Sequence, residues 1–295
     1  MTHLLSKSKY IRGLQCERAL WLDVHEPRLA RYTAEQMRRF DRGRDFEYAF
    51  KSRFPDGIDL SAELGRNVDL YPARTSQLLD GLSTPQSLRD SSPVSGEHMG
   101  RGMGPSPCST PQSLRDSSPV SGEHLDSSPC QGEGDRREAV GEGYKGVVLF
   151  EAGFQYDDVL VLADVVCQRE DGSLDIYEVK SGTTLSDTYR RDAALQHYII
   201  SHCRPVNSFS IVYNGLDGVN GANGQGGQDG FFAIVDLTAD LAAEDDRIAA
   251  NIAEMKTIVR ATAEPDTPTG QHCLTPYACP YQHHCQQGVR QLALF

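Results

Sequence analysis

The stretch at residues 159–182, VLVLADVVCQREDGSLDIYEVKSG, constrains the fold of this chain more than any other feature. Two apolar runs are joined there by the polar segment REDGS. Gly172 in this segment can adopt the left-handed backbone conformation of a three-residue hairpin loop. If the turn is centred on Asp171, Asp164 and Glu178 lie at equal distances from it. The pattern therefore predicts a β-hairpin in which these two acids face each other on one side of the sheet.

The predicted acid pair lies among valine, leucine and isoleucine residues. Two opposed carboxylates in such surroundings are costly unless a cation lies between them, and a divalent cation with oxygen ligands meets that need. Lys180 shares a face with Glu178, because side chains alternate along a strand. Its ammonium group is suited to contact a metal-bound water or an anionic phosphorus centre. The alternative is that both acids sit at exposed strand ends, since Glu-x-Lys alone is a common pattern, but the apolar flanks count against exposure.

The rest of the sequence alternates between helical and strand patterns. Ser6, Thr33 and Ser186 are placed to cap helices at their N-termini. The expected order is helices over 7–22, 34–54 and 74–82, strands over 146–154, 159–167 and 174–181, a helix over 187–203, strands over 208–214 and 231–237, and a helix over 237–261. This order predicts an α/β protein with a mixed β-sheet flanked by helices.

A repeated polar segment interrupts this order. The sequence STPQSLRDSSPVSGEH occurs at 83–98 and again at 109–124. It is rich in Ser, Pro and Gly and has few large apolar residues, so it cannot bury enough surface to offset its ordering entropy. We therefore expect four regions: an N-terminal helical part at 1–82, a disordered insertion at 83–146, a core at 147–264 and a cysteine-rich tail at 265–295.

Charge is unevenly distributed along the chain. The net charge is −12 at pH 7, which argues against indiscriminate binding to nucleic acids. Lys and Arg nevertheless outnumber Asp and Glu in residues 1–54, which fits either a lobe that guides a polyanion to one face or an ordinary solvated helix surface. No apolar run is long enough to span a bilayer and no secretory signal is recognisable, so we expect a cytoplasmic protein without a membrane partner.

The tail contains three cysteines at equal intervals: Cys273, Cys279 and Cys285. In a reducing cytosol such a group indicates a metal site more than a set of disulfides. Zinc would accept the three thiolates together with His272, His283 or His284, although zinc sites usually contain closer cysteine pairs. The residues alone leave the fourth ligand open.

Several segments resemble one nuclease family. ADVV at 163–166, YEVKSG at 177–182 and DAALQHYI at 192–199 resemble the RecB-like branch of the PD-(D/E)XK nucleases, in particular its CRISPR-associated and AddB-type members with an iron–sulphur cluster. The resemblance covers 1–82 and 147–295. It implies a PD-(D/E)XK nuclease core in which a 4Fe–4S cluster joins the N-terminal helices to the tail. The implied cluster ligands are Cys16, Cys273, Cys279 and Cys285.

The resemblance also implies the catalytic residues. Asp164 and Glu178 bind Mg²⁺ or Mn²⁺, and the backbone carbonyl of Val179 completes the ligand set. Lys180 is the catalytic lysine, and Gln196 is the characteristic glutamine of the following helix.

Four more residues are candidates for the surroundings of this site: Glu47, Glu151, Asp192 and Tyr198. Glu47 occupies a position where many family members have a histidine, so it is either an extra metal ligand or a surface acid. Glu151 is a further acid near the site, Asp192 precedes the helix glutamine by one turn, and Tyr198 follows that glutamine more closely than the family spacing does.

The activity implied by the resemblance is that of a metal-dependent deoxyribonuclease, with exonuclease action favoured, on single-stranded DNA or duplex ends. Two other classes of protein remain open. One is a catalytically silent iron–sulphur module that binds nucleic acid, and the other is a zinc-binding interaction protein. Cleavage with Mn²⁺ separates the first two classes, and metal content identifies the third.

Overall fold

The computed structural model describes residues 4–81, 146–215 and 231–286. The predicted insertion at 83–146 lies outside them except for its last residue. The described α-helices are α1 Lys7–Gln15, α2 Glu17–His25, α3 Ala34–Lys51, α4 Leu60–Leu64, α5 Tyr71–Gly81, α6 Asp187–Ser201, α7 Thr238–Ala242 and α8 Asp245–Arg260. The described strands are β1 Leu5–Ser6, β2 Ile58–Asp59, β3 Val148–Tyr156, β4 Val159–Gln168, β5 Leu174–Lys180, β6 Val206–Asn214 and β7 Phe232–Asp236. The predicted order of the longer elements is confirmed, whereas β1, β2 and α4 were not predicted.

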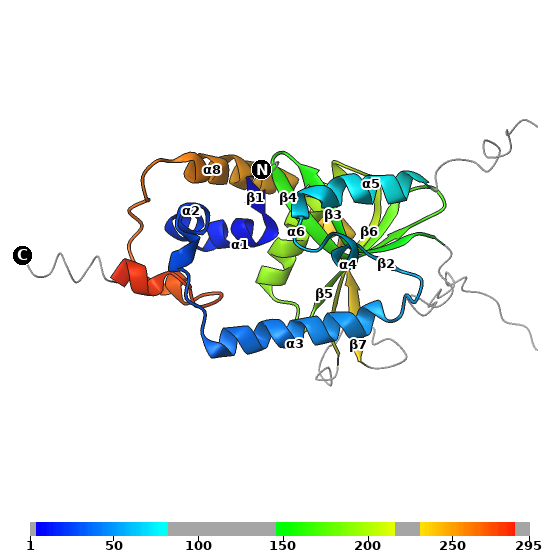
Figure 1. Cartoon of the computed structure of the whole chain (residues 1–295), viewed down its shortest axis with the longest axis horizontal. Coiled ribbons are helices and arrows are strands. Elements are labelled where there is room, and N and C mark those ends of the chain that lie inside the picture. The colour runs from blue at the N-terminus through cyan, green and yellow to red at the C-terminus, as the bar shows by residue number, and fades with distance from the viewer. Residues whose placement is uncertain (1–3, 82–145, 216–230, 287–295) are drawn as a thin grey trace, which may run out of the picture. The chain divides into compact units, whose positions relative to one another are not determined.

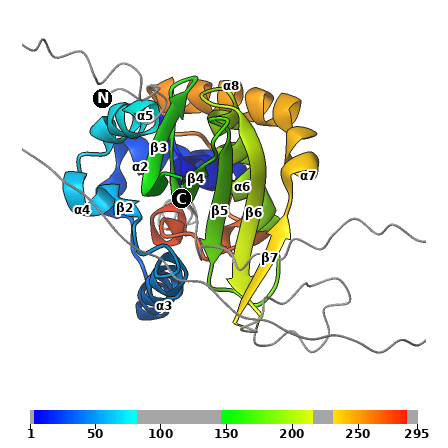
Figure 2. The same ribbon diagram turned by 90° about the vertical axis from the view of Figure 1, so that its right-hand side faces the viewer.

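The strands form one mixed sheet in the order β2-β3-β4-β5-β6-β7 (Figure 2). The pairs β2–β3 and β5–β6 are parallel, and the pairs β3–β4, β4–β5 and β6–β7 are antiparallel. A two-residue turn at Asp157 and Asp158 joins β3 to β4, and its φ values of 47° and 58° are typical of a type I′ hairpin. The expected mixed sheet flanked by helices is confirmed.

Helices cover both faces of the sheet (Figure 1). On one face, Phe46 and Phe50 of α3 and the following Phe54 pack against Val165 and Val179 in a cluster that we call the α3 core. On the other face, α6 packs together with α1, α5 and α8 in a larger cluster that we call the α6 core. None of the described helices is both long enough and apolar enough to cross a membrane.

The β4–β5 hairpin has the predicted register. Val165 pairs with Tyr177, and these two positions are equidistant from the centre of the turn. Gly172 has a φ of 83°, the left-handed conformation expected of it. Asp164 and Glu178 are the next positions along the two strands, directly beyond the last pair of this ladder.

β4 changes its neighbour at Asp164. From Val165 onward it pairs with β5, whereas its first two residues pair in parallel with β1. β3 occupies one edge of β4 along most of its length, so β1 and β5 share the other edge. The two strands of the hairpin therefore diverge beyond Asp164 and Glu178, and we call this point the fork. Helix α1 begins directly after β1, next to the fork.

Two predicted helices are each divided. The sequence predicts one helix over 7–22, but Cys16 separates α1 from α2 with an extended backbone, φ −167° and ψ 123°. Its N–H donates to the Arg12 carbonyl, and its own carbonyl accepts from the Leu20 N–H. One residue therefore ends α1 and begins α2, which local helix propensity does not predict. The predicted helix over 237–261 is likewise divided into α7 and α8.

Candidate functional site

Three carboxylates from adjacent strands lie in one row across the sheet. The β3–β4 ladder is interrupted at the position where Glu151 faces Asp164. Glu178 of β5 follows on the other side of Asp164, directly beyond the last pair of the β4–β5 ladder. At that point the Val179 N–H donates to Asp164 Oδ2 at 2.7 Å. The row therefore crosses the sheet at the fork.

The backbone of β3 is irregular at Glu151. Its φ of 56° is uncommon for a residue with a side chain. Phe150 and Ala152, which strand alternation would place on one face, belong to the α3 core and the α6 core respectively. Ala163 and Val165 of β4 likewise belong to opposite cores. A left-handed residue of this kind costs about 1–2 kcal/mol, and it occurs where two acids face each other.

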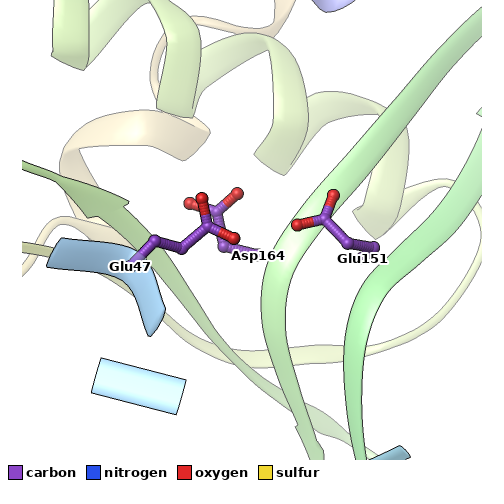
Figure 3. Close-up of side chains that lie close together, drawn as sticks. All are labelled: Glu47, Glu151 and Asp164. Atoms are coloured by element: carbon purple, nitrogen blue, oxygen red, sulfur yellow. The ribbon is translucent and has the colours of Figure 1, made fainter. Parts of the chain in front are cut away.

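Glu47 of α3 forms a group of three acids with Glu151 and Asp164 (Figure 3). The three carboxylates point toward one another, and one oxygen from each lies within 4.8 Å of the other two. Lys51, one turn after Glu47, contacts the Glu47 carboxylate and donates to Glu151 Oε1 at 2.8 Å. Its ammonium group therefore offsets part of the negative charge of the three acids.

Glu178 belongs to a second cluster of charges. Its Oε1 accepts from Lys7 Nζ at 2.8 Å and also contacts Lys180 Nζ. Lys180 Nζ donates to Asp192 Oδ2 of α6 at 2.5 Å, and Lys7 Nζ lies 4.0 Å from the same oxygen. Two lysines and two acids therefore meet next to Asp164, on the α6 side of the fork.

These charges determine which carboxyl binds a proton. Burial, and then the negative charge of Glu178, raise the pKa of Asp164 well above its ordinary value. Burial also opposes ionisation of Glu178, but Lys180 and Lys7 outweigh it and hold the pKa of Glu178 far below its ordinary value. Burial alone would lower the pKa of Lys180, yet Asp192 and Glu178 raise it well above its usual range. Of the two facing acids, Glu178 is therefore the ionised one.

Several buried polar atoms of β5 and α6 lack hydrogen-bond partners among the described residues. They include Glu178 Oε2, Asp192 Oδ1 and both amide atoms of Gln196. The side chains of Glu178 and Gln196 are 0% exposed. A buried polar atom without a partner costs about 1–3 kcal/mol. Carboxylate oxygens in this condition fit a site that a divalent cation completes.

Most of the predicted site residues meet at the fork, but Tyr198 does not. Asp192 contacts Lys180, and Gln196 follows Asp192 by four residues, about one turn further along α6. Tyr198 packs its ring against Tyr156 and His202, near the β3–β4 turn. The predicted role of Tyr198 near the site is therefore not supported by its contacts.

Two lysines at the site were missed by the sequence analysis. Lys51 follows Glu47 at the four-residue spacing that brings side chains together on a helix, so a signal for it was present. Lys7 had no such signal, because its contact with Glu178 spans 171 residues of sequence.

A cavity of about 760 Å³ opens beside the second charge cluster. Lys7 and Lys180 line it at the fork, and Tyr32, Tyr189 and Tyr277 line it elsewhere. A cavity of this size is within the range of small-ligand pockets. The cavity therefore gives access from the surface to the lysines beside Glu178.

The four predicted cysteine ligands lie in one region of the structure. Cys273 and Cys285 are buried, whereas Cys16 and Cys279 are partly buried. Burial, and to a smaller extent the charge of neighbouring thiolates of this set, raise the pKa of Cys16, Cys279 and Cys285. These mutual effects indicate sulfurs close enough to interact electrostatically, although they come from both ends of the described chain.

Hydrogen bonds hold the tail against the N-terminal helices. Gln15 Nε2 donates to the carbonyls of His272 at 2.8 Å, Thr275 at 3.3 Å and Tyr277 at 2.7 Å. Three further bonds have the same effect: Trp21 Nε1 to the Ala261 carbonyl at 2.9 Å, the Arg31 N–H to the Pro280 carbonyl at 2.9 Å, and Gln36 Nε2 to the Ala278 carbonyl at 3.0 Å. The tail is therefore fixed beside Cys16 by protein contacts.

The described thiols and imidazoles do not form a compact group of three ligands. No three of the described thiols and imidazoles have their ligand atoms within 4.8 Å of one another. A tetrahedral zinc ion with bonds of about 2.3 Å holds its sulfurs about 4 Å apart. His272 Nε2 lies 3.6 Å from Cys273 Sγ, whereas His284 Nε2 lies 3.1 Å from Glu264 Oε1.

No model of a known protein family matches this chain, and no curated protein is significantly similar to it. The assignment of a function therefore depends on the geometry and chemistry of the residues described above.

Proposed function

We propose that the protein is a metal-dependent deoxyribonuclease with a RecB-like PD-(D/E)XK core and a structural 4Fe–4S cluster. The observation that carries this proposal is the meeting of Asp164, Glu178 and Lys180 at the fork, directly beyond the last pair of the β4–β5 ladder. The same three residues carry the resemblance to that nuclease family. A mixed sheet with helices on both faces agrees with such a core.

Oxygen ligands for a divalent cation surround Asp164. Asp164 and Glu178 would hold the ion, and Glu178 Oε2, which has no partner within residues 4–81, 146–215 and 231–286, fits a ligand atom. Glu47 and Glu151 offer further carboxylate oxygens within 4.8 Å of an oxygen of Asp164. When bound, Mg²⁺ or Mn²⁺ lowers the pKa of a coordinated water and offsets the charge of the phosphodiester.

Lys180 and two residues of α6 complete the proposed site. Asp192 and Glu178 keep the Lys180 ammonium charged, so it can stabilise the negative charge that develops on the phosphate oxygens during attack. Gln196, whose two amide atoms have no partner in the described part of the chain, can donate to a phosphate oxygen and accept from the attacking water.

The cavity beside Lys180 supports a single strand or a duplex end as substrate. Its lysines are suited to contact a phosphate backbone, and its tyrosines are suited to stack on bases. A volume of about 760 Å³ accommodates roughly one or two nucleotides, which is far less than a duplex requires.

The cysteine region is proposed to hold the 4Fe–4S cluster. Four thiols from two distant segments support this proposal, and Cys16, Cys273, Cys279 and Cys285 would hold the cluster. Burial raises the thiol pKa of Cys16, Cys279 and Cys285, and a bound cluster would hold those thiols as thiolates.

The proposed activity is tested by cleavage of labelled single- and double-stranded DNA in the presence of Mn²⁺. We expect Asp164→Ala, Glu178→Ala and Lys180→Ala each to reduce cleavage by at least about 100-fold. The two acid variants should also lose Mn²⁺ binding, whereas Lys180→Ala should retain it. Asp171→Asn, in the turn of the same hairpin, is the matched control and should cleave at the parental rate.

Three outcomes would contradict parts of this proposal. Equal cleavage by Lys180→Ala and the parent would remove the hairpin from the active site. A parent that contains iron and retards DNA in a gel, but never cleaves it, would be a silent binding module. Zinc in place of iron, with no nuclease activity, would favour an interaction protein.

A further inference from the structure

Lys7 lies at the fork, although it is near the beginning of the described chain. It is the first residue of α1, and the Ser6 hydroxyl caps this helix by accepting from the Lys9 N–H at 3.4 Å. The preceding residues, Leu5 and Ser6, pair with the first two residues of β4. The backbone of Lys7 is therefore fixed by both a strand pairing and a helix cap at the point where β4 and β5 diverge.

The Lys7 ammonium group bridges the buried acids and the open cavity. Lys7 Nζ lies 2.8 Å from Glu178 Oε1 and 4.0 Å from Asp192 Oδ2. Lys180 Nζ contacts the same oxygen of Glu178, so the two ammonium groups lie side by side. The Lys7 side chain is 27% exposed and lines the cavity of about 760 Å³, as does Lys180.

The charges at the fork determine whether the site can accept a phosphodiester. Five carboxylates meet there, from Glu47, Glu151, Asp164, Glu178 and Asp192, and three lysines face them: Lys7, Lys51 and Lys180. With all of them ionised and one divalent cation bound, the site is neutral. Without Lys7 it would carry one negative charge, which repels a phosphodiester.

We propose that Lys7 is a second catalytic lysine, which contacts a phosphate oxygen of the substrate beside Lys180. This inference rests on the proposed nuclease function and extends it by one named residue. If Glu178 holds a divalent cation, its carboxylate would bind Lys7 less strongly. The Lys7 ammonium then remains at the wall of the cavity, within reach of a phosphate that approaches Lys180.

The inference is tested with Lys7→Met, Lys7→Arg and the control Lys9→Met. Lys9 is on the same helix, outside the set of described residues that line the cavity. We expect Lys7→Met to lower kcat/KM for a labelled oligonucleotide with Mn²⁺ by about 100-fold. Lys7→Arg should retain most of the activity, because a guanidinium group also donates to phosphate. Lys9→Met should cleave at the parental rate.

A second measurement separates a phosphate contact from a structural role. Binding of a fluorescent oligothymidine, with Ca²⁺ in place of Mn²⁺, is followed as the salt concentration rises. Loss of one phosphate contact lowers the slope of log K against log salt by about 0.7–1, and Lys7→Met should have this effect whereas Lys9→Met should not. A role limited to neutralising Glu178 would lower the melting temperature without changing the slope.

The outcomes for Lys7 and for the nuclease function are distinguishable. If the parent cleaves while Lys7→Met cleaves and binds like Lys9→Met, the Lys7 inference is overturned and the nuclease function stands. If the parent binds without cleaving, a reduced salt slope in Lys7→Met still supports the phosphate contact. A parent that neither binds nor cleaves DNA overturns both.

Discussion

Lys51 connects two acids that come from different elements. It contacts Glu47 on its own helix and Glu151 on β3, whose left-handed backbone directs the carboxylate toward α3. Burial alone would lower the pKa of Lys51, but Glu151 and Glu47 raise it. Burial is also the main cause that raises the pKa of Glu151, against the attraction of Lys51. At the scale of single residues, the Lys51 ammonium therefore offsets the negative charge of Glu47 and Glu151, as a bound cation would.

We expect Lys51→Met to lower the melting temperature in EDTA and to increase the rise in melting temperature caused by Mn²⁺. Without the ammonium group, Glu47 and Glu151 repel each other, and a bound cation relieves that repulsion. Each kcal/mol corresponds to roughly 2–4 °C in a domain of this size. Arg44→Met is the control, because Arg44 is exposed on the same helix and its ion pair with Asp41 contributes little. An unchanged response to Mn²⁺ would separate Lys51 from the cation site.

Helix α1 links the fork to the cysteine region. Lys7 is its first residue and Cys16 follows its last residue. Nine residues of α-helix are about 13 Å long, so one rigid element spans the distance between the two sites. Tyr10 is buried in the α6 core, and Asn251 of α8 donates to its hydroxyl at 3.0 Å. At the scale of elements, α1 therefore has one end at the fork and the other at the cysteine region.

We expect Cys16→Ser to lose iron and to loosen the tail, because a bound cluster would join segments that are far apart in sequence. Limited proteolysis should then cleave the chain beyond Ala261 before it cleaves the sheet. Cys203→Ser is the control, since Cys203 is exposed and lies outside the proposed ligand set. Unchanged iron in Cys16→Ser would exclude Cys16 as a ligand and favour His272, whose Nε2 lies 3.6 Å from Cys273 Sγ.

A second prediction at this scale concerns His197 on α6 and the stability of the protein at acid pH. Burial lowers the pKa of His197 below its ordinary value of 6.5, against the smaller opposite effect of Asp245. The unfolded chain therefore binds a proton at His197 more readily than the folded protein does. As a result, the free energy of unfolding decreases as the pH falls below 6.5. We expect His197→Phe to reduce the loss of urea resistance between pH 7.5 and pH 5.5 (roughly one unit on either side of that value). His202→Gln, at the end of the same helix, should keep the parental pH dependence; an equal effect of both substitutions would contradict the assignment.

The two ends of the described chain pack against each other. His25 of α2 lies 3.0 Å from the Val259 carbonyl of α8, and the Tyr281 hydroxyl donates to Asp23. Figure 1 shows α1 and α2 beside α8 and the cysteine tail. At the scale of the whole molecule, the N-terminal helices therefore belong to the same compact unit as the sheet and the tail.

The residues before and after the segment 82–145, which is outside the described part of the chain, both contact Gln168. The Gln168 N–H donates to the Val147 carbonyl at 2.8 Å, and its Nε2 donates to the Leu79 carbonyl at 3.1 Å. The end of α5 and the beginning of β3 are therefore close together. We expect replacement of residues 83–146 by a short Gly/Ser linker to leave a cooperative thermal melt and the DNA cleavage of the parent, because loop closure costs little. If this variant aggregates under conditions where the parent melts cooperatively, the segment is required for the fold.

Local rules were sufficient for the hairpin and for the helix starts. Gly172 permits the turn, and equal distance from the turn sets the register of the β4–β5 ladder, which ends at Val165 and Tyr177 beside the two acids. Ser6, Thr33 and Ser186 each accept a hydrogen bond from an N–H in the first turn of the predicted helix. These features depend on neighbours a few residues away, so the sequence by itself determined them.

Only the tertiary structure decided what surrounds the acid pair. Lys7 reaches Glu178, which is 171 residues away in the sequence, because β1 takes the edge of β4 that β5 leaves. The left-handed Glu151 and the extended Cys16 both contradict local propensity, and each occurs where contacts from other elements outweigh it. A local pattern contains no information on such partners, because the free energy that selects them arises only when distant segments pack together.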